Sequence, residues 1–422
     1  MYALLFLFSA AVMVYWPILD GRFLMLWDDQ WVAMNSYTEA GFTATNIWSV
    51  LTEFYEGQYA PMNELTYITL YALVGYDPFW FHLTSLLIHI INVGLVYFFI
   101  KRLLRLAGGF SLSARQRIAF ITALLLAVHP FTVESVAWIS ASKTIIYVLF
   151  YLVALLFYLK YTQGKKIMFY LLTILFFIIS FGGKEQAVVL PLCLLLVDHA
   201  LKRDLRSYKI WLEKIPFFLL ALFFGIVTLL SHGPIDLTAE NTGYPFYQRI
   251  VFACYTLIEY LSKCLLPVKL SYIYPFPNQI GEPLPVRFWF YPAALILLIA
   301  SLWSFWQRKW IFFGVTFFVI HIAVTLHIIS LSRFAIVADR YVYLSAVGVF
   351  FIIACFINKG CTHEFKYRKA VVPAFVIYLA SISVYAHTRT YVWHDVYSLK
   401  KELREQLQER EDYRELMKKH DY

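Results

Sequence analysis

The sequence predicts an all-α polytopic membrane protein with about eleven transmembrane helices. Of its 422 residues, 61% are hydrophobic and 19% aromatic, and only 15% carry a charge. This composition excludes a water-soluble globule. Apolar runs long enough to cross a bilayer recur along almost the whole chain. Because lipid offers backbone amides no hydrogen-bond partner, such runs are expected to be helical.

Eleven apolar segments are expected to cross the membrane, with bounds good to a few residues. They are 1–19, 79–104, 118–135, 144–160, 167–182, 185–201, 215–231, 288–306, 310–329, 341–358 and 370–387. The first lacks the basic n-region and small-residue cleavage site of a signal peptide, so we interpret it as a retained helix.

Residues 247–266 form one further apolar segment, whose crossing is ambiguous. Glu259 and Lys263 lie one helical turn apart within it, which favours an interfacial or re-entrant helix over a lipid-exposed span. A single crossing there would also place the basic runs 308–309 and 359–369 outside, against the positive-inside rule. We therefore expect this segment not to complete a span.

Charge predicts which ends of the helices face the cytoplasm. The connection after the second helix contains five basic residues and no acid: Lys101, Arg102, Arg105, Arg115 and Arg117. Basic residues at 160–166 and at 202–214, among them Arg203 and Lys214, mark two further cytoplasmic connections. The net charge of +9 is thus attributed to the basic cytoplasmic connections that orient the helices, and no nucleic-acid partner is expected.

The first external loop, residues 20–78, has the opposite charge. It carries Asp20, Asp28, Asp29, Glu39, Glu53, Glu56, Glu64 and Asp77 against the single basic Arg22. This long acidic loop is expected on the non-cytoplasmic side. Residues 395–422, dense in Glu, Lys and Arg, are expected to form a charged helical tail on that same side. Residues 1–394 make up the transmembrane domain.

Two groups of polar residues are candidates for function. On the second helix, His82, Ser85, His89 and Asn92 lie on one face, which predicts hydrogen bonds between helices, with His82 nearest the outside. The second group comes from three external connections, "HPFTVESVAWISASK" (129–143), "FGGKEQ" (181–186) and "SRFAIVADRYVYL" (332–344).

These connections are expected to bring basic side chains to the level of the first loop. The positive-inside rule disfavours basic residues in non-cytoplasmic connections, so the presence of these four must be explained: Lys143, Lys184, Arg333 and Arg340. An anionic head group is one reason. A local ion pair, such as Lys184 with Glu185 or Arg340 with Asp339, is the alternative.

Five stretches in register resemble one family over residues 20–400. They are "LWDDQWVAMN", "YAPMNELTYITLYALVGYDPFWFHLTSLLIHIINVGLVYF", "HPFTVESVAWISASKTIIYVLFYLVALLFY", "KEQAVVLPLCLLLVDHALKR" and "VADRYVYLSAVG". The chain is similar to the transmembrane and tetratricopeptide-repeat-containing proteins, in the protein O-mannosyltransferase-like branch of the GT-C glycosyltransferases. The resemblance implies a GT-C-type helical bundle.

The resemblance also implies an activity. Such an enzyme moves a mannose-like sugar from a polyprenyl-phosphate carrier to an acceptor hydroxyl, here expected to be protein Ser or Thr, with inversion. Asp28 matches the first acid of the family's acidic pair and is expected to be the general base, while Asp29 holds the loop or the acceptor. Two adjacent carboxylates also repel, which raises one pKa.

The remaining site residues are assigned by their charge and place. Arg340 is the first candidate for the donor phosphate, since a guanidinium grips phosphate through two hydrogen bonds, with Arg333, Lys143 and Lys184 as helpers. His82, His129, Glu134 and Glu64 are expected to position the acceptor or the loop. No metal site and no cofactor are expected, and a divalent cation, used by distant relatives, is not indicated.

The sequence departs from the family in two places. No repeat domain follows "RTYVWHDVYSLKKELREQ", so we expect the acceptor-binding module to be lost or supplied by a separate repeat protein. The family's "ERK" before the fourth helix reads Ala141-Ser142-Lys143, which keeps only the lysine. Acceptor choice is therefore open between protein and a lipid or cell-surface glycan.

Two further alternatives belong to other classes. A lipid-linked-sugar transporter or flippase would carry charged pairs near the bilayer midplane and inverted repeats, neither of which is clear here. A catalytically dead scaffold is disfavoured by the retained Asp28, Lys143 and Arg340. The expected location is the bacterial inner membrane, or the ER membrane in a eukaryote, with the site facing periplasm or lumen.

Overall fold

The computed structural model describes residues 2–231, 243–328, 335–361 and 366–407, and in that part the chain is helical. Two isolated β-bridges, Tyr55 with Gln58 and Tyr274 with Val337, are the extended pairings there. Arg333 and the tail beyond residue 407 lie outside the described residues. The all-α fold class is confirmed for the described part of the chain.

The α-helices follow the expected order along the chain. They are α1 (Tyr2–Tyr15), α2 (Asp29–Val32), α3 (Ser36–Ala40), α4 (Ala44–Thr52), α5 (Pro61–Val74), α6 (Pro78–Ala107), α7 (Leu112–Val128), α8 (Val133–Ala137), α9 (Ser142–Gly164), α10 (Ile167–Phe181), α11 (Leu190–Ala200), α12 (Tyr208–Ser231), α13 (Phe246–Leu265), α14 (Phe290–Trp306), α15 (Lys309–Ile322), α16 (Ala346–Gly360), α17 (Arg368–Thr390) and α18 (Val396–Leu407).

The helices differ in whether they are long enough to span a bilayer. Among the described residues, five helical segments are long and apolar enough: Tyr2–Asp20, Pro78–Ala107, Ile139–Gly164, Tyr208–Ser231 and Arg368–Trp393. The pair Leu112–Val128 and Pro130–Ala137, bent by 57°, makes up to six. Four shorter apolar helices lie in expected spans: Ile167–Phe181, Val286–Ser301, Lys309–Thr325 and Ala346–Gly360. The count of eleven crossings stays a prediction.

Local chemistry sets the ends of the longest helix, α6. The Asp77 side chain accepts a hydrogen bond from the Phe79 amide at 3.1 Å, and Pro78 occupies the first turn, where its missing N–H costs nothing. The helix ends before Gly108, whose φ of 71° lies in the left-handed region that glycine adopts freely. These signals give a helix of 30 residues.

The polar stripe of α6 faces the interior of the bundle, as expected. His82, Ser85, His89 and Asn92 are all buried. His89 Nδ1 lies 2.6 Å from the Tyr343 hydroxyl, and the Asn92 amide donates to the Ile145 carbonyl at 2.9 Å. The prediction of helix-to-helix hydrogen bonds is confirmed for these two residues.

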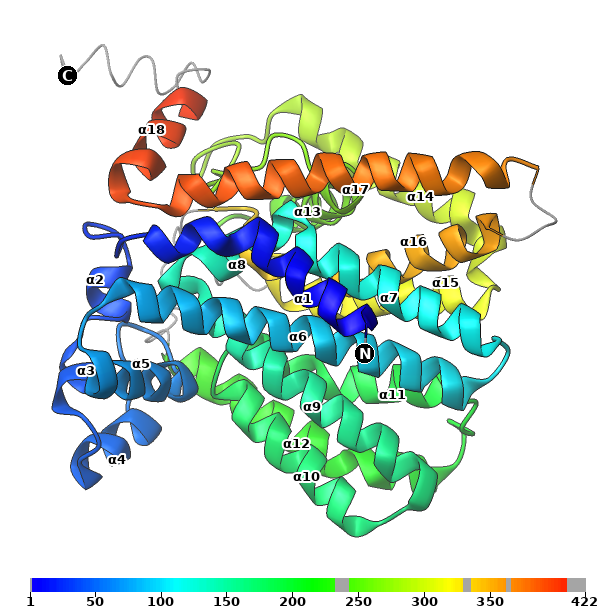
Figure 1. The fold of residues 1–422 in the computed structure, drawn as a ribbon, viewed down its shortest axis with the longest axis horizontal. Helices are drawn as coiled ribbons and strands as arrows, with labels where there is room; N and C mark the ends of the chain where they lie inside the picture. The colour runs from blue at the N-terminus through cyan, green and yellow to red at the C-terminus, as the bar shows by residue number, and fades with distance from the viewer. Residues whose placement is uncertain (1, 232–242, 329–334, 362–365, 408–422) are drawn as a thin grey trace.

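The first loop forms a small helical lobe at one end of the bundle. Figure 1 places α2 to α5 together beyond the start of α6, with α18 above them. The end of α17 returns to this lobe, because the Arg22 amide donates to the His394 carbonyl at 2.8 Å. Trp393 stacks on Trp138 with ring centroids 5.2 Å apart. The segment after α17 therefore contacts both the start of the first loop and the connection before α9.

α15 and α16 cross with their backbones in contact. A Cβ built on Gly314 would lie 2.7 Å from the Gly348 carbonyl oxygen, closer than real Cβ atoms come. Both positions thus require glycine, as at close helix crossings in membranes. This crossing fixes the start of α16, which follows the segment that carries Arg340.

α13 packs beside that same segment. The Tyr260 hydroxyl donates to the Ala338 carbonyl at 3.1 Å and accepts from the Ala338 amide at 2.9 Å. Glu259 and Lys263, which lie one helical turn apart, form an ion pair at 2.8 Å. That α13 does not complete a membrane span stays a prediction.

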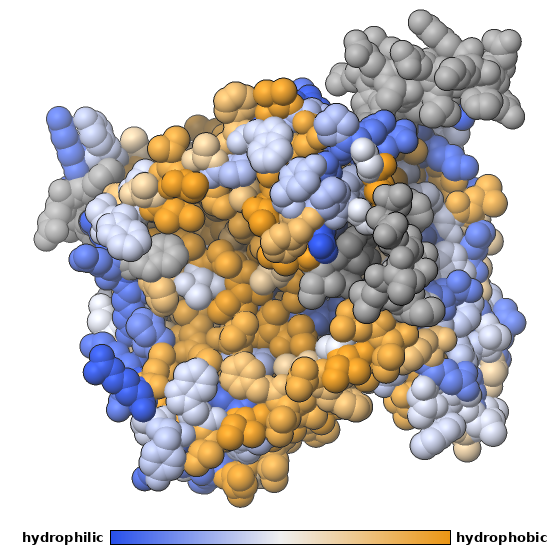
Figure 2. Space-filling model, turned by 180° about the vertical axis from the view of Figure 1, so that it is seen from behind, coloured by the Kyte–Doolittle hydropathy of each residue, from blue (hydrophilic) through white to orange (hydrophobic). Residues whose placement is uncertain are grey.

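The outer surface of the bundle is apolar, as a bilayer requires. Figure 2 shows apolar side chains gathered across the middle of one face, with hydrophilic residues toward both sides. On α12 the side chains of Leu219, Leu222 and Phe223 are exposed. Contiguous exposure on this scale is typical of a membrane-facing surface. The chain is thus an all-α membrane protein.

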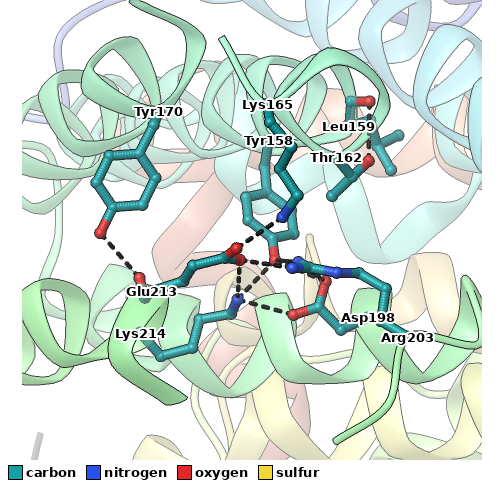
Figure 3. Close-up of polar contacts among 9 residues, drawn as sticks. All are labelled: Tyr158, Leu159, Thr162, Lys165, Tyr170, Asp198, Arg203, Glu213 and Lys214. Atoms are coloured by element: carbon teal, nitrogen blue, oxygen red, sulfur yellow. Dashed lines mark hydrogen bonds and ion pairs between the residues drawn. The ribbon is translucent and has the colours of Figure 1, made fainter. Parts of the chain in front are cut away.

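Figure 3 shows a buried ion cluster that joins α9, α11 and α12. Lys214 and Asp198, both with fully buried side chains, pair at 2.7 Å. Arg203 contacts Asp198 at 2.8 Å and Glu213 at 2.7 Å. The Tyr158 hydroxyl donates to Asp198 at 2.6 Å. Arg203 and Lys214, interpreted from sequence as topology charges only, therefore also hold three helices together.

Asp198→Asn is expected to lower the free energy of unfolding by about 3–5 kcal/mol, because the buried Lys214 would lose its close counter-ion and keep only Glu213, at 3.8 Å. Lys165→Gln removes the half-exposed partner of Glu213 and should cost about 1 kcal/mol or less. Thermal unfolding of both variants in the same lipid nanodiscs measures the difference. Equal melting temperatures would show that this cluster does not stabilise the bundle.

Candidate functional site

Asp29 ties the first loop to the bundle. Its side chain is fully buried, and one carboxylate oxygen accepts from the Leu24 amide at 2.8 Å. The other oxygen accepts from the Ser140 amide at 3.0 Å and from the Ser140 hydroxyl. Burial raises the pKa of Asp29 to about 6, and these hydrogen bonds oppose that shift. A carboxylate occupied in this way positions the loop.

Asp28, the neighbour of Asp29 in the chain, has a partly exposed side chain. Burial raises the pKa of Asp28, while the charges of Lys143 and Arg340 and a hydrogen bond with Trp31 lower it. Asp28 thus lies within electrostatic range of the start of α9 and of the segment before α16. Of the two acids, Asp28 is the one near basic side chains.

Lys143 stands on the first turn of α9 and faces the first loop. Its ammonium donates to the Gln58 side-chain oxygen at 2.5 Å. Glu64, on α5, accepts from the Asn35 amide at 3.1 Å. Burial raises the pKa of Glu64 to about 7, and the charge of Lys143 opposes that shift. Lys143 therefore connects the acids of the loop to the helical bundle.

Lys184 lies in the turn after α10, pressed against α9. A Cβ on Gly183 would lie 2.9 Å from the Tyr147 amide, so only glycine permits this approach. The buried Lys184 ammonium donates to the Thr144 hydroxyl at 3.1 Å and sits 4.8 Å from the Tyr341 ring centroid. Burial lowers the pKa of Lys184 to about 7; Glu185 opposes that shift, and Lys143 and Arg340 add to it.

Arg340 is held by Glu134, not by Asp339. Its guanidinium contacts the buried Glu134 carboxylate at 2.5 Å, and its backbone amide donates to the same carboxylate at 2.8 Å. Asp339 instead accepts from the Tyr274 hydroxyl at 2.9 Å. The local Arg340–Asp339 pair considered from sequence is therefore wrong. Glu134 has a structural partner rather than a free carboxylate.

Two aromatic rings frame the Arg340 guanidinium. Its carbon lies 5.4 Å from the Trp138 ring centroid and 5.0 Å from that of Tyr341. Contact with the ring faces restricts the guanidinium plane, and a guanidinium has five N–H donors, of which the contact with Glu134 uses one. The arginine side chain is 23% exposed. Arg340 can therefore accept a second anion beside Glu134.

Together, Lys143, Lys184 and Arg340 form a cationic cluster, two members of which act on Asp28. The charges of Lys143 and Arg340 lower the pKa of Lys184 and also lower that of Asp28. Three neighbouring cations repel one another and favour a multiply charged anion between them. Such an arrangement can bind a phosphate and place a carboxylate next to it.

The two predicted histidines lie elsewhere in the packing. His129 caps the short helix Pro130–Thr132, accepting from the Phe131 amide at 3.2 Å, and its ring packs 4.9 Å from that of Phe350. His82 is buried against the chain at Gly21, where an added Cβ would lie 2.8 Å from its Nε2. That these histidines position the acceptor or the loop stays a prediction.

Several neighbours of the cluster were not singled out from sequence. Gln58, Ser140, Trp138 and Tyr341 each contact a site residue, and Trp393 extends the aromatic packing behind Trp138. Only Tyr341 had a sequence signal, since it follows Arg340 directly. The others come from separate elements and are joined by folding alone.

Among the described residues, no group of three or more His, Cys, Asp or Glu side chains is arranged to hold a metal ion. The free cysteines are spread over α11, α13 and α16 and the turn after α16.

Comparison with known proteins finds a partial similarity. A stretch of 161 residues, 36% of the chain, is 29% identical to the protein O-mannosyl-transferase TMTC1 of Homo sapiens and covers 17% of that protein. The Mus musculus protein of the same name is 28% identical over 161 residues, covering 16% of its length. The match thus spans about a sixth of these curated relatives. No protein-family model matches the chain.

Proposed function

We propose that this chain is a glycosyltransferase that moves a mannose-like monosaccharide from a polyprenyl-phosphate carrier to a hydroxyl of protein Ser or Thr. The observation that carries the proposal is that Asp28 lies within electrostatic range of Lys143 and Arg340, which in turn act on Lys184. The similarity to protein O-mannosyl-transferases supports the same reaction class.

The reaction is a single displacement. The acceptor oxygen attacks the anomeric carbon while Asp28 takes its proton, and the bond from that carbon to the phosphate oxygen breaks. The electron pair leaves with the polyprenyl phosphate, whose added negative charge is stabilised by the three cations. One displacement inverts the anomeric configuration. Asp29 serves as the positioning residue that holds Asp28 at the acceptor.

The site is proposed to face the periplasm or the lumen. The acidic first loop and the basic connections at the other helix ends support this orientation. A polyprenyl-phosphate donor enters laterally from the bilayer, and an acceptor protein approaches from water.

The test is transfer of label by the purified protein in liposomes. Polyprenyl-phosphate sugars, each with a radiolabelled monosaccharide, are offered with co-purified membrane proteins and lipids. We expect label on protein, released by mild alkaline β-elimination from Ser or Thr, with the anomeric configuration opposite to that of the donor. A nucleotide sugar, which lacks the lipid chain, serves as the control donor and should transfer nothing.

Label found only in lipid or glycan would replace the protein acceptor with a lipid acceptor of the same reaction class. A failure of every polyprenyl-phosphate sugar to transfer, with protein that remains folded in the same liposomes, would reject the enzyme hypothesis.

A further inference from the structure

A second charged feature lies at the end of the bundle opposite the candidate site. It is a groove of about 460 Å³ between α6, α7 and α9, here called the basic groove. Its lining residues are Leu95, Phe98, Lys101, Arg102, Arg105, Leu112, Arg115, Val153, Leu156, Phe157 and Lys160. Its volume lies within the usual range for small-molecule sites.

The lining of the basic groove changes character along the helices. On α6, Leu95 and Phe98 precede the three cations of residues 101–105. On α9, Val153, Leu156 and Phe157 precede Lys160 at i, i+3, i+4 and i+7. Both helices therefore present an apolar wall toward the middle of the bundle and cations toward its end. A ligand that matches this wall is amphiphilic.

The five cations of the basic groove have no acid among its lining residues. The sequence contains no Asp or Glu between Asp77 and Glu134, nor between Glu134 and Glu185. No ion pair joins any of the five to a described carboxylate. The Arg102 Nε is buried and lacks a hydrogen-bond partner in the described part of the chain. The groove therefore carries an unbalanced positive charge.

The basic groove lies at a membrane boundary. α9 carries Lys143 at one end and Lys160 near the other, about 25 Å apart at 1.5 Å per residue. That separation is close to the hydrocarbon thickness of a bilayer, about 30 Å. The cations of the groove thus lie at the head-group level of the leaflet opposite the candidate site, and its apolar wall lies within the acyl chains.

We propose that the basic groove binds an anionic glycerophospholipid, with its phosphate against the five cations and an acyl chain along the apolar wall. Charge complementarity favours an anion, and the apolar wall distinguishes a membrane lipid from free phosphate. By the predicted topology this is a lipid of the cytoplasmic leaflet, whose anionic lipids attract basic segments next to the membrane. The site is separate from the cluster around Asp28.

Native mass spectrometry of the full chain with defined lipids tests the proposal. The probes are phosphatidylglycerol and phosphatidylcholine with identical acyl chains. We expect the parent to bind phosphatidylglycerol about tenfold or more tightly than phosphatidylcholine. The variant Arg102→Gln/Arg105→Gln/Lys160→Gln should lose about tenfold or more of the phosphatidylglycerol affinity. Its affinity for phosphatidylcholine should change little.

The matched control removes the same charge from the same end of the molecule. Lys166→Gln/Arg206→Gln/Lys209→Gln alters three exposed basic residues that do not line the basic groove. This control should keep the parent's preference for phosphatidylglycerol. If the groove variant aggregates, the single variants Arg102→Gln and Lys160→Gln replace it in the test, because they alter different helices. Each should weaken phosphatidylglycerol binding by about fivefold.

Four results would overturn the proposal. They are equal affinity of the parent for the two lipids, equal losses in the groove and control variants, release of phosphatidylglycerol by millimolar inorganic phosphate, and tighter binding of a polyprenyl phosphate than of phosphatidylglycerol. The second result would indicate a diffuse surface potential. The last two would identify a soluble anion or an isoprenoid carrier as the occupant instead.

Discussion

Asp28→Asn is expected to lower the rate of sugar transfer by about 10²-fold or more, the usual scale for losing a general base. Asparagine keeps the shape of the side chain but cannot take the acceptor proton. Because Asp28 is partly exposed and Asp29 anchors the loop, the variant should fold and still bind donor. The measurement is single-turnover transfer from polyprenyl-phosphate sugar, with donor affinity determined in parallel.

The pH dependence of transfer is an independent test of Asp28 as the general base. A base acts when ionised, so activity falls as pH drops through its pKa. Burial raises the pKa of Asp28, which moves this acidic limb above the range of an ordinary aspartate, about 3.9. The limb should be absent from the residual activity of Asp28→Asn.

Asp29→Asn is the matched control, and it is expected to act on stability. The buried carboxylate accepts from two segments at once, and an amide nitrogen would face one of those donors, which costs about 1–3 kcal/mol. Lower thermal stability with a normal rate in the folded fraction fits this role. Normal transfer by Asp28→Asn together with an inactive but stable Asp29→Asn would exchange the two roles, and normal transfer by both would reject this loop as the site.

Arg340→Ala is expected to abolish measurable donor binding and to lower the rate of transfer by about 10²–10³-fold, the scale for losing one preorganised donor to a developing charge. It also strands the buried Glu134 carboxylate, which should lower the free energy of unfolding by about 3–5 kcal/mol. Arg340→Lys keeps the charge but loses the bidentate contact, so it should slow transfer and retain the fold.

The double variant Arg340→Met/Glu134→Gln separates the two effects. Removing both charges eliminates the stranded carboxylate, so thermal stability should recover most of the loss seen in Arg340→Ala. Donor binding should not recover, because Lys143 and Lys184 alone remain. Fluorescence or calorimetric titration with polyprenyl-phosphate sugar measures binding in nanodiscs. Parallel recovery of stability and donor binding in the double variant would remove Arg340 from the site.

Local patterns predicted the helical elements well. The spacing of His89 and Asn92 on one face of α6 predicted buried contacts between helices, and both side chains make them. The helical-turn spacing of Glu259 and Lys263 placed both charges on one face of a helix, where they pair. Both predictions depend on one helix at a time, so 3.6-residue periodicity is sufficient to make them.

The candidate site was predicted in its composition but not in its pairing. The sequence identified Lys143, Lys184 and Arg340 as cations in non-cytoplasmic connections, and the fold brings Lys143 and Arg340 within electrostatic range of both Asp28 and Lys184. It did not identify Glu134 as the partner of Arg340, which lies 206 positions away in the chain. A local rule favours Asp339, the adjacent acid, because contact across such a distance leaves no periodic trace.

By itself, the sequence determined that this is an all-α membrane protein with an acidic first loop and cationic external connections, because composition and hydropathy depend on no contact between elements. Only the tertiary structure decided that Asp29 is the buried one of the two adjacent acids and that Asp28 is the one near the cations. It also decided that Arg203 and Lys214 join a buried cluster instead of remaining in solvent. These outcomes follow from how segments far apart in the chain pack against one another, as when Asp29 accepts from Ser140, and such contacts leave no local pattern in the sequence.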